Sequence, residues 1–257
     1  MIASLGMYDM PFISVANDTI WASVAARIDG APAHLDRSRP LGEIWRSPDL
    51  LLAQTCGLPL LVELGGVVQL VATPIYRFPG CDGPRYRSWI VVGANSPATT
   101  VADLRGHRAA INGWDSNSGM NLLRAAVAPL ASSGPFFGSV TVTGGHLASL
   151  AAVATGEADA AAIDCVAYGL VARHRPDLVA GTRILASTPG SAGLPLVTAA
   201  ATSPALVATL RTALRRMLTD PATEAARAAL GWTELAELTE ADYRPILSLG
   251  LGVPPLA

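Results

Sequence analysis

The sequence predicts an α/β protein in which short buried strands alternate with helices. In residues 139–164, a run with strand character around Val140 meets a Gly-Gly pair, and apolar residues at helical spacing then follow from His146. The apolar run at 160–163 is short enough for a buried parallel strand. The same alternation recurs along the chain, which predicts mostly parallel sheets flanked by helices.

Aliphatic and β-branched runs bounded by Gly, Pro or Asn predict the strands, and apolar residues at helical spacing predict the helices. Asn17 or Asp18 is expected to cap the first helix, because both residue types are good N-caps. The expected strands lie at 2–7, 50–55, 67–73, 89–93, 108–112, 140–143, 160–163, 183–187 and 196–200. The expected helices lie at 17–28, 41–45, 118 onward, 146 onward, 165–174, 204–218, 222–230 and 240–249.

Two extended runs, at 89–93 and 194–200, bracket the middle series of strands and helices. If both runs cross between lobes, residues 1–92 and 195–257 form one lobe and residues 93–194 form the other. The expected architecture is therefore a two-lobed α/β fold with a ligand cleft between the lobes. Ligand groups are expected at the carboxyl ends of strands, where open α/β sheets bind their ligands.

Composition indicates a globular protein and excludes several functions. Of the 257 residues, 51% are hydrophobic and 15% are charged, which supplies ample core. The formal net charge is −2 without a basic block, so we expect no nucleic-acid partner. All 18 basic residues are arginine, which excludes a Schiff-base, pyridoxal-phosphate or P-loop lysine. An anion must then be held by arginine, histidine, hydroxyls or backbone N–H groups.

The three cysteines, Cys56, Cys81 and Cys165, are widely separated and match neither a disulfide framework nor a zinc motif. The first residues have no basic segment before an apolar run, so we expect no signal peptide, and we also expect no membrane span. The predicted location is the cytoplasm. The alternative is the periplasm, if the amino terminus is truncated.

Polar residues that could hold an anion follow the strands of the predicted middle lobe. Ser116, Asn117 and Ser118 stand between a strand and a helix, where they form either an anion cradle or an ordinary helix cap. His146 begins a helix, and Asp164 ends a strand, where it can accept a hydrogen bond from a protonated ligand oxygen or cap the next helix. If His146 must be charged to hold an anion, binding weakens as pH rises through the histidine range.

Three further candidates flank the strands of the other predicted lobe. Tyr8 follows the first strand, Thr55 follows the second, and Ser88 precedes the strand at 89–93. Their hydroxyls can reach a cleft. Tyr76 and Tyr86 are secondary candidates, for which packing or a place at the pocket rim is the alternative.

No nucleophile, base and orienting third group stand in a recognisable order, although His146 and Asp164 could serve as an acid/base pair. No pattern indicates a metal or a cofactor. Cys56 stands at a possible helix start, where a thiol pKa can fall, but the simpler interpretation is a small buried residue. The histidines lack metal-ligand spacing, and the sequence has neither a GxSxG motif nor a dinucleotide fingerprint. We therefore expect no cofactor and favour a protein that is not an enzyme.

A series of short motifs covers most of the chain. They are MYD at 7–9, QTCGLPL at 54–60, YRSWIVV at 86–92, DLRGHRAAING at 103–113, SNSGMN at 116–121, GGHLASLAAVATGEADAAAID at 144–164 and GLPLVT at 193–198. In this order they resemble the phosphate/phosphonate-type solute-binding proteins of ABC transporters, which have the type II periplasmic-binding-protein fold. His146 matches the family's ligand histidine, and Ser116, Asn117 and Ser118 stand where the family has a Ser-Thr-Ser loop.

The resemblance implies a solute-binding protein that closes its lobes over a small anion, either phosphate- or phosphonate-like or a carboxylate. It also implies a possible ABC permease as partner. We expect the protein to be a monomer or weak dimer. Two alternatives stay open. One is a cytoplasmic enzyme on the same fold that acts on a small carboxylate or sulfinate, similar to menaquinone-pathway enzymes or a cysteine-dependent desulfinase. The other is a cytoplasmic sensor module.

Overall fold

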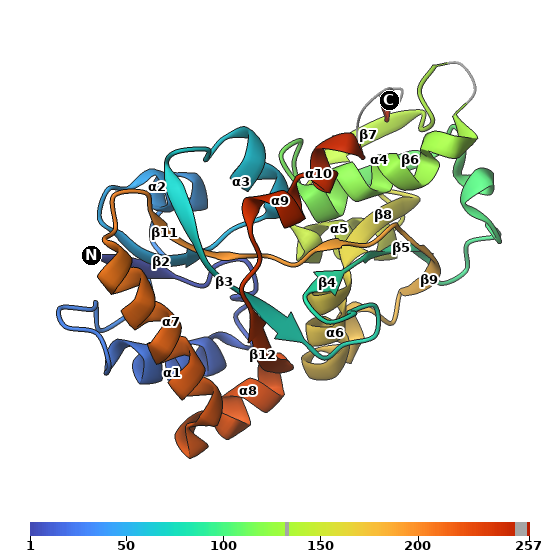
Figure 1. The fold of residues 1–257 in the computed structure, drawn as a ribbon. Coiled ribbons are helices and arrows are strands. Elements are labelled where there is room, and N and C mark those ends of the chain that lie inside the picture. Colours follow the sequence, from blue (N-terminus) through green and yellow to red (C-terminus); the bar gives the residue numbers. More distant parts are fainter. Residues whose placement is uncertain (132–133, 250–255) are drawn as a thin grey trace. The chain divides into compact units, whose positions relative to one another are not determined.

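The computed structural model describes residues 1–131, 134–249 and 256–257. The chain divides into two compact units, each with its own five-stranded sheet and helices (Figure 1). Unit 1 comprises Met1–Arg77 and Gly193–Tyr243, and unit 2 comprises Phe78–Ala192 and Arg244–Ala257. The division into lobes at residues 93 and 194 stays a prediction.

The sheet of unit 1 has the strand order β1-β2-β11-β3-β12. β1 and β2 are parallel, β11 lies antiparallel between β2 and β3, and β12 is antiparallel to β3. All residues of β1, β2 and β11 are buried, as expected for aliphatic runs without polar alternation. The strands are β1 (Ile2–Ser4), β2 (Leu50–Gln54), β3 (Val68–Tyr76), β11 (Leu196–Ala199) and β12 (Trp232–Ala236).

The helices of unit 1 bury apolar faces against this sheet and against one another. α7 packs on β3 and β12, and α1 packs against α7 and α8 (Figure 1). The start of α7 is fixed locally, because the Ser203 hydroxyl accepts a hydrogen bond from the Leu206 N–H at 3.2 Å and Pro204 follows in the first turn. The helices are α1 (Ser14–Ala25), α2 (Leu41–Arg46), α3 (Gly57–Val62), α7 (Pro204–Thr219), the 3₁₀ turn η5 (Pro221–Thr223), α8 (Glu224–Leu230) and α9 (Glu240–Tyr243).

The sheet of unit 2 has the order β7-β6-β8-β5-β9. β7, β6 and β8 are parallel neighbours, and β5 runs antiparallel to both β8 and β9. β4 and β10 form a separate antiparallel pair. The strands are β4 (Arg85–Tyr86), β5 (Ser88–Gly93), β6 (Arg108–Ile111), β7 (Ser139–Val142), β8 (Ala160–Asp164), β9 (Thr182–Ser187) and β10 (Ser191–Ala192).

Helices contact the central strands of the unit 2 sheet. α5 contacts β5, β6 and β8, while α4 and α6 contact β5 and β8. β8, which is buried along its whole length, and the buried residues Ile90, Val91 and Val92 of β5 form the middle of the core. The short side chains of Ala160, Ala161 and Ala162 leave room for the helices that pack there. The helical segments are η1 (Val101–Leu104), η2 (Asn117–Asn121), α4 (Leu122–Val127), η3 (Ala128–Leu130), α5 (His146–Ala154), α6 (Cys165–His174), η4 (Pro176–Leu178) and α10 (Pro245–Ser248).

The predicted α/β class is confirmed, with mixed rather than mostly parallel sheets in both units. β5 and β11 run against their neighbours, and β12 adds a strand where only a connection was expected. Apolar patterning reports that a strand is buried but not the direction in which it runs. Direction depends on the crossovers, and no helix precedes β5 within its unit to impose a parallel entry.

Two helix boundaries differ from the prediction. The first helix begins at Ser14, and Asn17 lies inside it, buried, where its side chain donates to the Tyr8 carbonyl oxygen and to Asp9 Oδ1. Asn17 therefore holds the chain that follows β1 and does not cap the helix. The helix expected at 240–249 is divided into α9 and α10, because Pro245 lacks the N–H that a continuous helix needs.

Candidate ligand-binding site

The carboxyl edge of the unit 2 sheet collects polar residues from several strands. β6, β7 and β8 are parallel, so their carboxyl ends lie at the same edge. The chain leaves β6 toward β7 on one side and leaves β8 toward β9 on the other. The gap between β6 and β8 is therefore a topological switch point, which is where open α/β sheets bind ligands.

The segment after β6 is a capped turn. Ser116 Oγ accepts from the Gly119 N–H at 2.9 Å, so the predicted capping role is present. One turn of π-helix follows at η2, and its residues are buried. The first N–H groups of a helix have no partner within the helix, and π-turns are frequent at functional sites. Capping and ligand binding are compatible at this segment.

His146 lies beside this turn, at the start of α5. Its Nε2 is 3.0 Å from Ser118 Oγ. Its Nδ1 is buried and has no hydrogen-bond partner among the described residues. Burial lowers the pKa of His146 to about 3, so the ring is neutral at ordinary pH. Its environment therefore favours a neutral hydrogen-bonding group over the charged ring considered from the sequence.

Ser88 links this turn to the neighbouring strands. It is fully buried and its hydroxyl donates to the Ser118 carbonyl oxygen at 3.0 Å. Its N–H donates to Thr188 Oγ1 at 2.9 Å, and in the antiparallel register it lies opposite Asp164. The antiparallel direction of β5 is what brings Ser88, the first residue of that strand, to the carboxyl edge.

Asp164 ends β8 and caps α6. Its Oδ1 accepts from the N–H groups of Val166 at 2.7 Å and Ala167 at 3.2 Å. The side chain is 1% exposed, which leaves a carboxylate almost completely removed from water. The capping interpretation of Asp164 is thus present in the structure, and a ligand contact would be made in addition to it.

The side-chain amide of Asn117 makes hydrogen bonds with three other side chains of unit 2. Its Nδ2 donates to Tyr86 Oη and to Ser191 Oγ, both at 3.0 Å, and its Oδ1 accepts from Asn121 Nδ2 at 3.1 Å. A hydroxyl could not donate both hydrogen bonds, so the amide has a structural use at this position. No pattern in the sequence indicates Ser191, and the sequence indicates Tyr86 only as a secondary candidate.

The two candidates in unit 1 also follow neighbouring strands. Tyr8 comes after β1 and Thr55 after β2, and these strands are parallel. The buried Tyr8 ring packs edge-on against Tyr76, with centroids 5.3 Å apart, and Tyr76 lies 6.0 Å from the Trp232 ring. Thr55 is fully buried and its N–H donates to the Pro195 carbonyl oxygen at 3.0 Å.

The structure therefore separates the predicted residues into two groups. Ser88, Ser116, Asn117, Ser118, His146 and Asp164 lie together at one edge of unit 2, and Tyr8 and Thr55 lie at the carboxyl edge of the unit 1 sheet. Their contact with a ligand stays a prediction. Within the described residues, no group of three His, Cys, Asp or Glu side chains could hold a metal ion.

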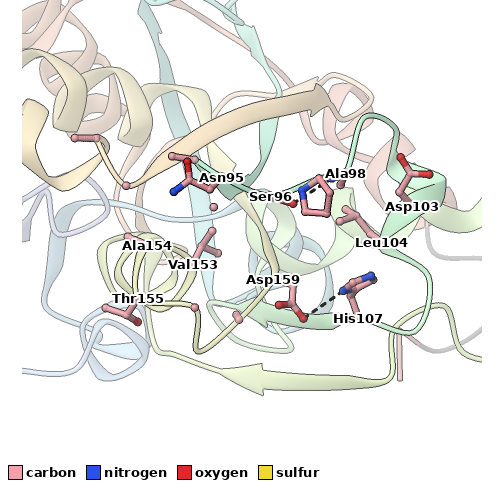
Figure 2. Close-up of a pocket in the computed structure, with 17 residues that line it drawn as sticks. Asn95, Ser96, Ala98, Asp103, Leu104, His107, Val153, Ala154, Thr155 and Asp159 are labelled. Carbon is pink, nitrogen blue, oxygen red and sulfur yellow. Dashed lines mark hydrogen bonds and ion pairs between the residues drawn. The ribbon is translucent and has the colours of Figure 1, made fainter.

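A hollow of about 890 Å³ lies at the opposite edge of the unit 2 sheet (Figure 2). It is lined near the starts of β6 and β8 by His107 and Asp159, and by Asp103 and the chain after β5. His107 Nδ1 lies 3.6 Å from Asp159 Oδ2, and Arg108 also pairs with Asp159. Figure 2 marks the contact of His107 with Asp159 as a dashed line. None of the predicted site residues lines this hollow.

The two α/β units and the polar switch-point edge are features of substrate-binding proteins, and comparison with protein families gives the same class. Residues 47–243 match the model of the ABC transporter, phosphonate, periplasmic substrate-binding protein family. The chain belongs to this family and is a solute-binding protein. Family membership implies a small ligand and an ABC permease as partner. No curated protein sequence matches the chain.

Solved structures share the fold at low sequence identity. PhnD1 from Prochlorococcus marinus MIT 9301, in complex with methylphosphonate, has a TM-score of 0.75 at 13% identity and covers 97% of this chain and 96% of its own. A binding component of an ABC phosphonate transporter from Pseudomonas aeruginosa, PA3383, has a TM-score of 0.75 at 14% identity, covering 96% and 84%. XAC2383 from Xanthomonas citri, bound to ATP, has a TM-score of 0.68 at 18% identity, covering 98% and 95%.

None of the helices in the described part of the chain has the length and apolar character that crossing a membrane requires.

Proposed function

We propose that the protein binds a small tetrahedral oxyanion, of the phosphonate or phosphate type, at the carboxyl edge of the unit 2 sheet. The observation that carries this proposal is the hydrogen bond between Ser118 Oγ and His146 Nε2, beside the N-terminus of a buried π-turn. The proposed ligand residues of unit 2 are Ser88, Ser116, Asn117, Ser118, His146 and Asp164. The roles of Tyr8 and Thr55 in unit 1 stay predictions.

The proposed site would neutralise an anion with uncharged donors. Serine hydroxyls, a neutral imidazole and the first N–H groups of a helix can all donate to ligand oxygens. The Asp164 carboxylate would repel a fully ionised ligand, because two like charges in a buried site disfavour each other. The arrangement therefore favours an anion that still carries a proton on one oxygen, because that O–H can donate a hydrogen bond to Asp164.

The family supports the phosphonate class, while the fold alone does not choose a ligand. PhnD1 was solved with methylphosphonate, and XAC2383, with the same fold, was solved with ATP. The choice of a tetrahedral oxyanion for this chain therefore rests on the family match and on the chemistry of the unit 2 edge.

Calorimetric titration with methylphosphonate, phosphate, sulfate and malate tests the proposal. We expect methylphosphonate and phosphate to bind, and sulfate to bind at least about tenfold more weakly, a difference of about 1.4 kcal/mol. Sulfate is the matched control because it is tetrahedral but carries no proton at neutral pH. Equal binding of sulfate, or binding of malate alone, would contradict the proposal. Mass spectrometry of the same samples is expected to recover the ligand unchanged, whereas turnover would favour an enzyme.

We further propose that the protein acts as a monomer or weak dimer and delivers its ligand to an ABC permease. Light scattering across a range of concentrations tests the oligomeric state. Cell fractionation tests the compartment: recovery from the periplasm favours transport, and recovery from the cytoplasm favours the sensor or enzyme alternatives. Co-purification with a permease supplies a direct test of the partner.

A further inference from the structure

Two cysteines of unit 2 lie close together near the proposed site, although they are 84 positions apart in sequence. Cys81 Sγ and Cys165 Sγ are 3.6 Å apart. Cys165 is the fully buried first residue of α6, and Cys81 lies half-buried in the connection before β4. We propose that Cys81 and Cys165 are a modification site that forms a reversible intramolecular disulfide by exchange with an external disulfide.

The turn that carries Cys81 is packed against one face of α6. Gly80 has φ +95°, and a Cβ there would come within 2.8 Å of the Cys165 Cβ, so only glycine allows this approach. One turn further along α6, the Phe78 ring lies against Gly169 and leaves no room for a side chain there. The Arg173 guanidinium is 4.5 Å from the centroid of the same ring. These contacts, at four-residue spacing on α6, hold the two sulfurs near each other before any bond forms.

The remaining movement is small. A disulfide has an S–S distance of about 2.05 Å, so the sulfurs must approach by about 1.5 Å from their present separation. Cys81 can supply this movement because it belongs to a turn and its N–H donates to the Phe78 carbonyl oxygen at 3.0 Å within that turn. Cys165 stays fixed by its place in the helix and by its N–H, which donates to the Arg87 carbonyl oxygen at 3.0 Å.

The two thiols differ in reactivity. The hydrogen bond from Cys165 lowers the pKa of the Cys81 thiol. The same hydrogen bond, together with burial, raises the pKa of the Cys165 thiol. Cys81 is also the more exposed of the two, so it is the thiolate that meets an external reagent.

The chemistry is a two-step thiol–disulfide exchange with a disulfide R–S–S–R, such as oxidised glutathione. The Cys81 thiolate attacks one sulfur, which breaks the external S–S bond, forms a mixed disulfide and releases one RS⁻. Cys165 then loses its proton and attacks Cys81 Sγ, which forms the internal bond and releases a second RS⁻. The protein dithiol is oxidised by two electrons, the external disulfide is reduced by two electrons, and both protons leave with the released thiols.

The bond would tie the connection before β5 to the start of α6, directly beside Asp164. Cys165 follows Asp164 in the chain, and Ser88 lies opposite Asp164 in the sheet. The inference does not depend on the proposed ligand, since both sulfurs and all the contacts that position them lie within unit 2.

The test is incubation of the full-length protein with oxidised glutathione, followed by peptide mapping without reduction. We expect one linked peptide pair that contains Cys81 and Cys165, the loss of both of these thiols to a maleimide probe in denaturant, and recovery of both with dithiothreitol. The linked protein is expected to melt on the order of 10 °C higher than the reduced protein, because the bond closes a long loop.

Matched variants sharpen the test. Cys81→Ser is the variant of choice, because a half-buried position tolerates a serine better than the fully buried position of Cys165. This variant should form no linked pair and should melt at the same temperature with and without oxidant. Cys56→Ser, in unit 1, should still form the Cys81–Cys165 pair. A glutathione adduct that persists on Cys81, a link between two chains, or a link that includes Cys56 would each overturn the proposal.

Discussion

The two edges of the unit 2 sheet differ in how far their polar side chains are exposed to water. At the carboxyl edge, Ser88 is fully buried, Ser118 is 5% exposed and Asp164 is 1% exposed, and they are hydrogen-bonded within the fold. At the opposite edge, beside the 890 Å³ hollow, His107 is 51% exposed and Asp159 is 30% exposed. The 890 Å³ hollow therefore lies where the polar groups are solvated.

This difference teaches that burial of polar groups, and not open volume alone, favours the carboxyl edge as the proposed site. A buried polar group interacts strongly because water does not screen it, whereas an exposed ion pair contributes little. The topological switch point between β6 and β8 also lies at the carboxyl edge and not at the opposite edge. Each type of polar residue occurs at both edges, so matched substitutions can test whether the two edges differ as their burial predicts.

The largest expected effect is on the pH dependence of the unfolding free energy, compared between His146 at the carboxyl edge and His107 at the opposite edge. Burial lowers the pKa of His146 to about 3, while the unfolded chain titrates near about 6.5. The unfolded state therefore binds more protons between these values, so the stabilising effect is fully present above about pH 6.5 and is lost as pH falls toward 3. We expect a loss of about 1.4 kcal/mol per pH unit, or about 3 kcal/mol by pH 4, measured by urea unfolding.

The control for this prediction is at the opposite edge. His146→Gln should flatten the acid slope of the unfolding free energy, and His107→Gln, at an exposed position, should keep it. A slope that is the same in the wild type and in His146→Gln would show that the ring is not buried in the neutral form.

The second effect is on ligand affinity and stability, compared between Asp164 at the carboxyl edge and Asp159 at the opposite edge. Asp164→Ala should weaken methylphosphonate binding by roughly 10- to 100-fold, because a charge-assisted hydrogen bond contributes about 1.5–3 kcal/mol. It should also destabilise the protein by about 1 kcal/mol through the lost cap of α6. Calorimetry measures the first and urea unfolding the second. Asp159→Ala should leave affinity unchanged, and equal affinities in the two variants would remove Asp164 from the site.

The third effect is on ligand affinity, compared between Ser118 at the carboxyl edge and Ser96 beside the hollow. Ser118→Ala should weaken methylphosphonate binding about tenfold, or about 1.4 kcal/mol, because it removes one hydroxyl and its hydrogen bond to His146. Ser96→Ala is the matched control, since Ser96 lines the hollow and its hydroxyl accepts only a local bond from the Ala98 N–H. An unchanged affinity in Ser118→Ala, measured by calorimetry, would contradict the proposed site.

The smallest effect is the stability of the opposite edge itself. Arg108 pairs with Asp159 at 2.8 Å and lowers the pKa of that carboxyl to about 2, but both side chains are partly solvated. Asp159→Ala should therefore change the free energy of unfolding by less than about 1 kcal/mol at neutral pH. A loss of several kcal/mol in urea unfolding would mean that this edge is as tightly coupled to the core as the carboxyl edge.

Local signals in the sequence determined much of unit 2. The helix at Cys165–His174 and its Asp164 cap follow from an apolar strand that ends in a capping residue, and His146 begins α5 directly after the Gly-Gly turn. These features depend on residues within a few positions of one another. Parallel β6, β7 and β8 then bring Ser118, His146 and Asp164 to one edge, so the candidate edge of unit 2 could also be predicted.

Only the tertiary structure decided the remaining features, because they depend on residues far apart in the chain. The antiparallel entry of β5 and the fifth strand β12 follow from sheet pairing, which apolar patterning does not encode. The bonds of Asn117 to Tyr86 and Ser191 and the neutral state of His146 depend on which groups surround a side chain after folding. The approach of Cys81 to Cys165 depends on the packing of a turn against α6, since two cysteines 84 positions apart form no motif that would indicate it.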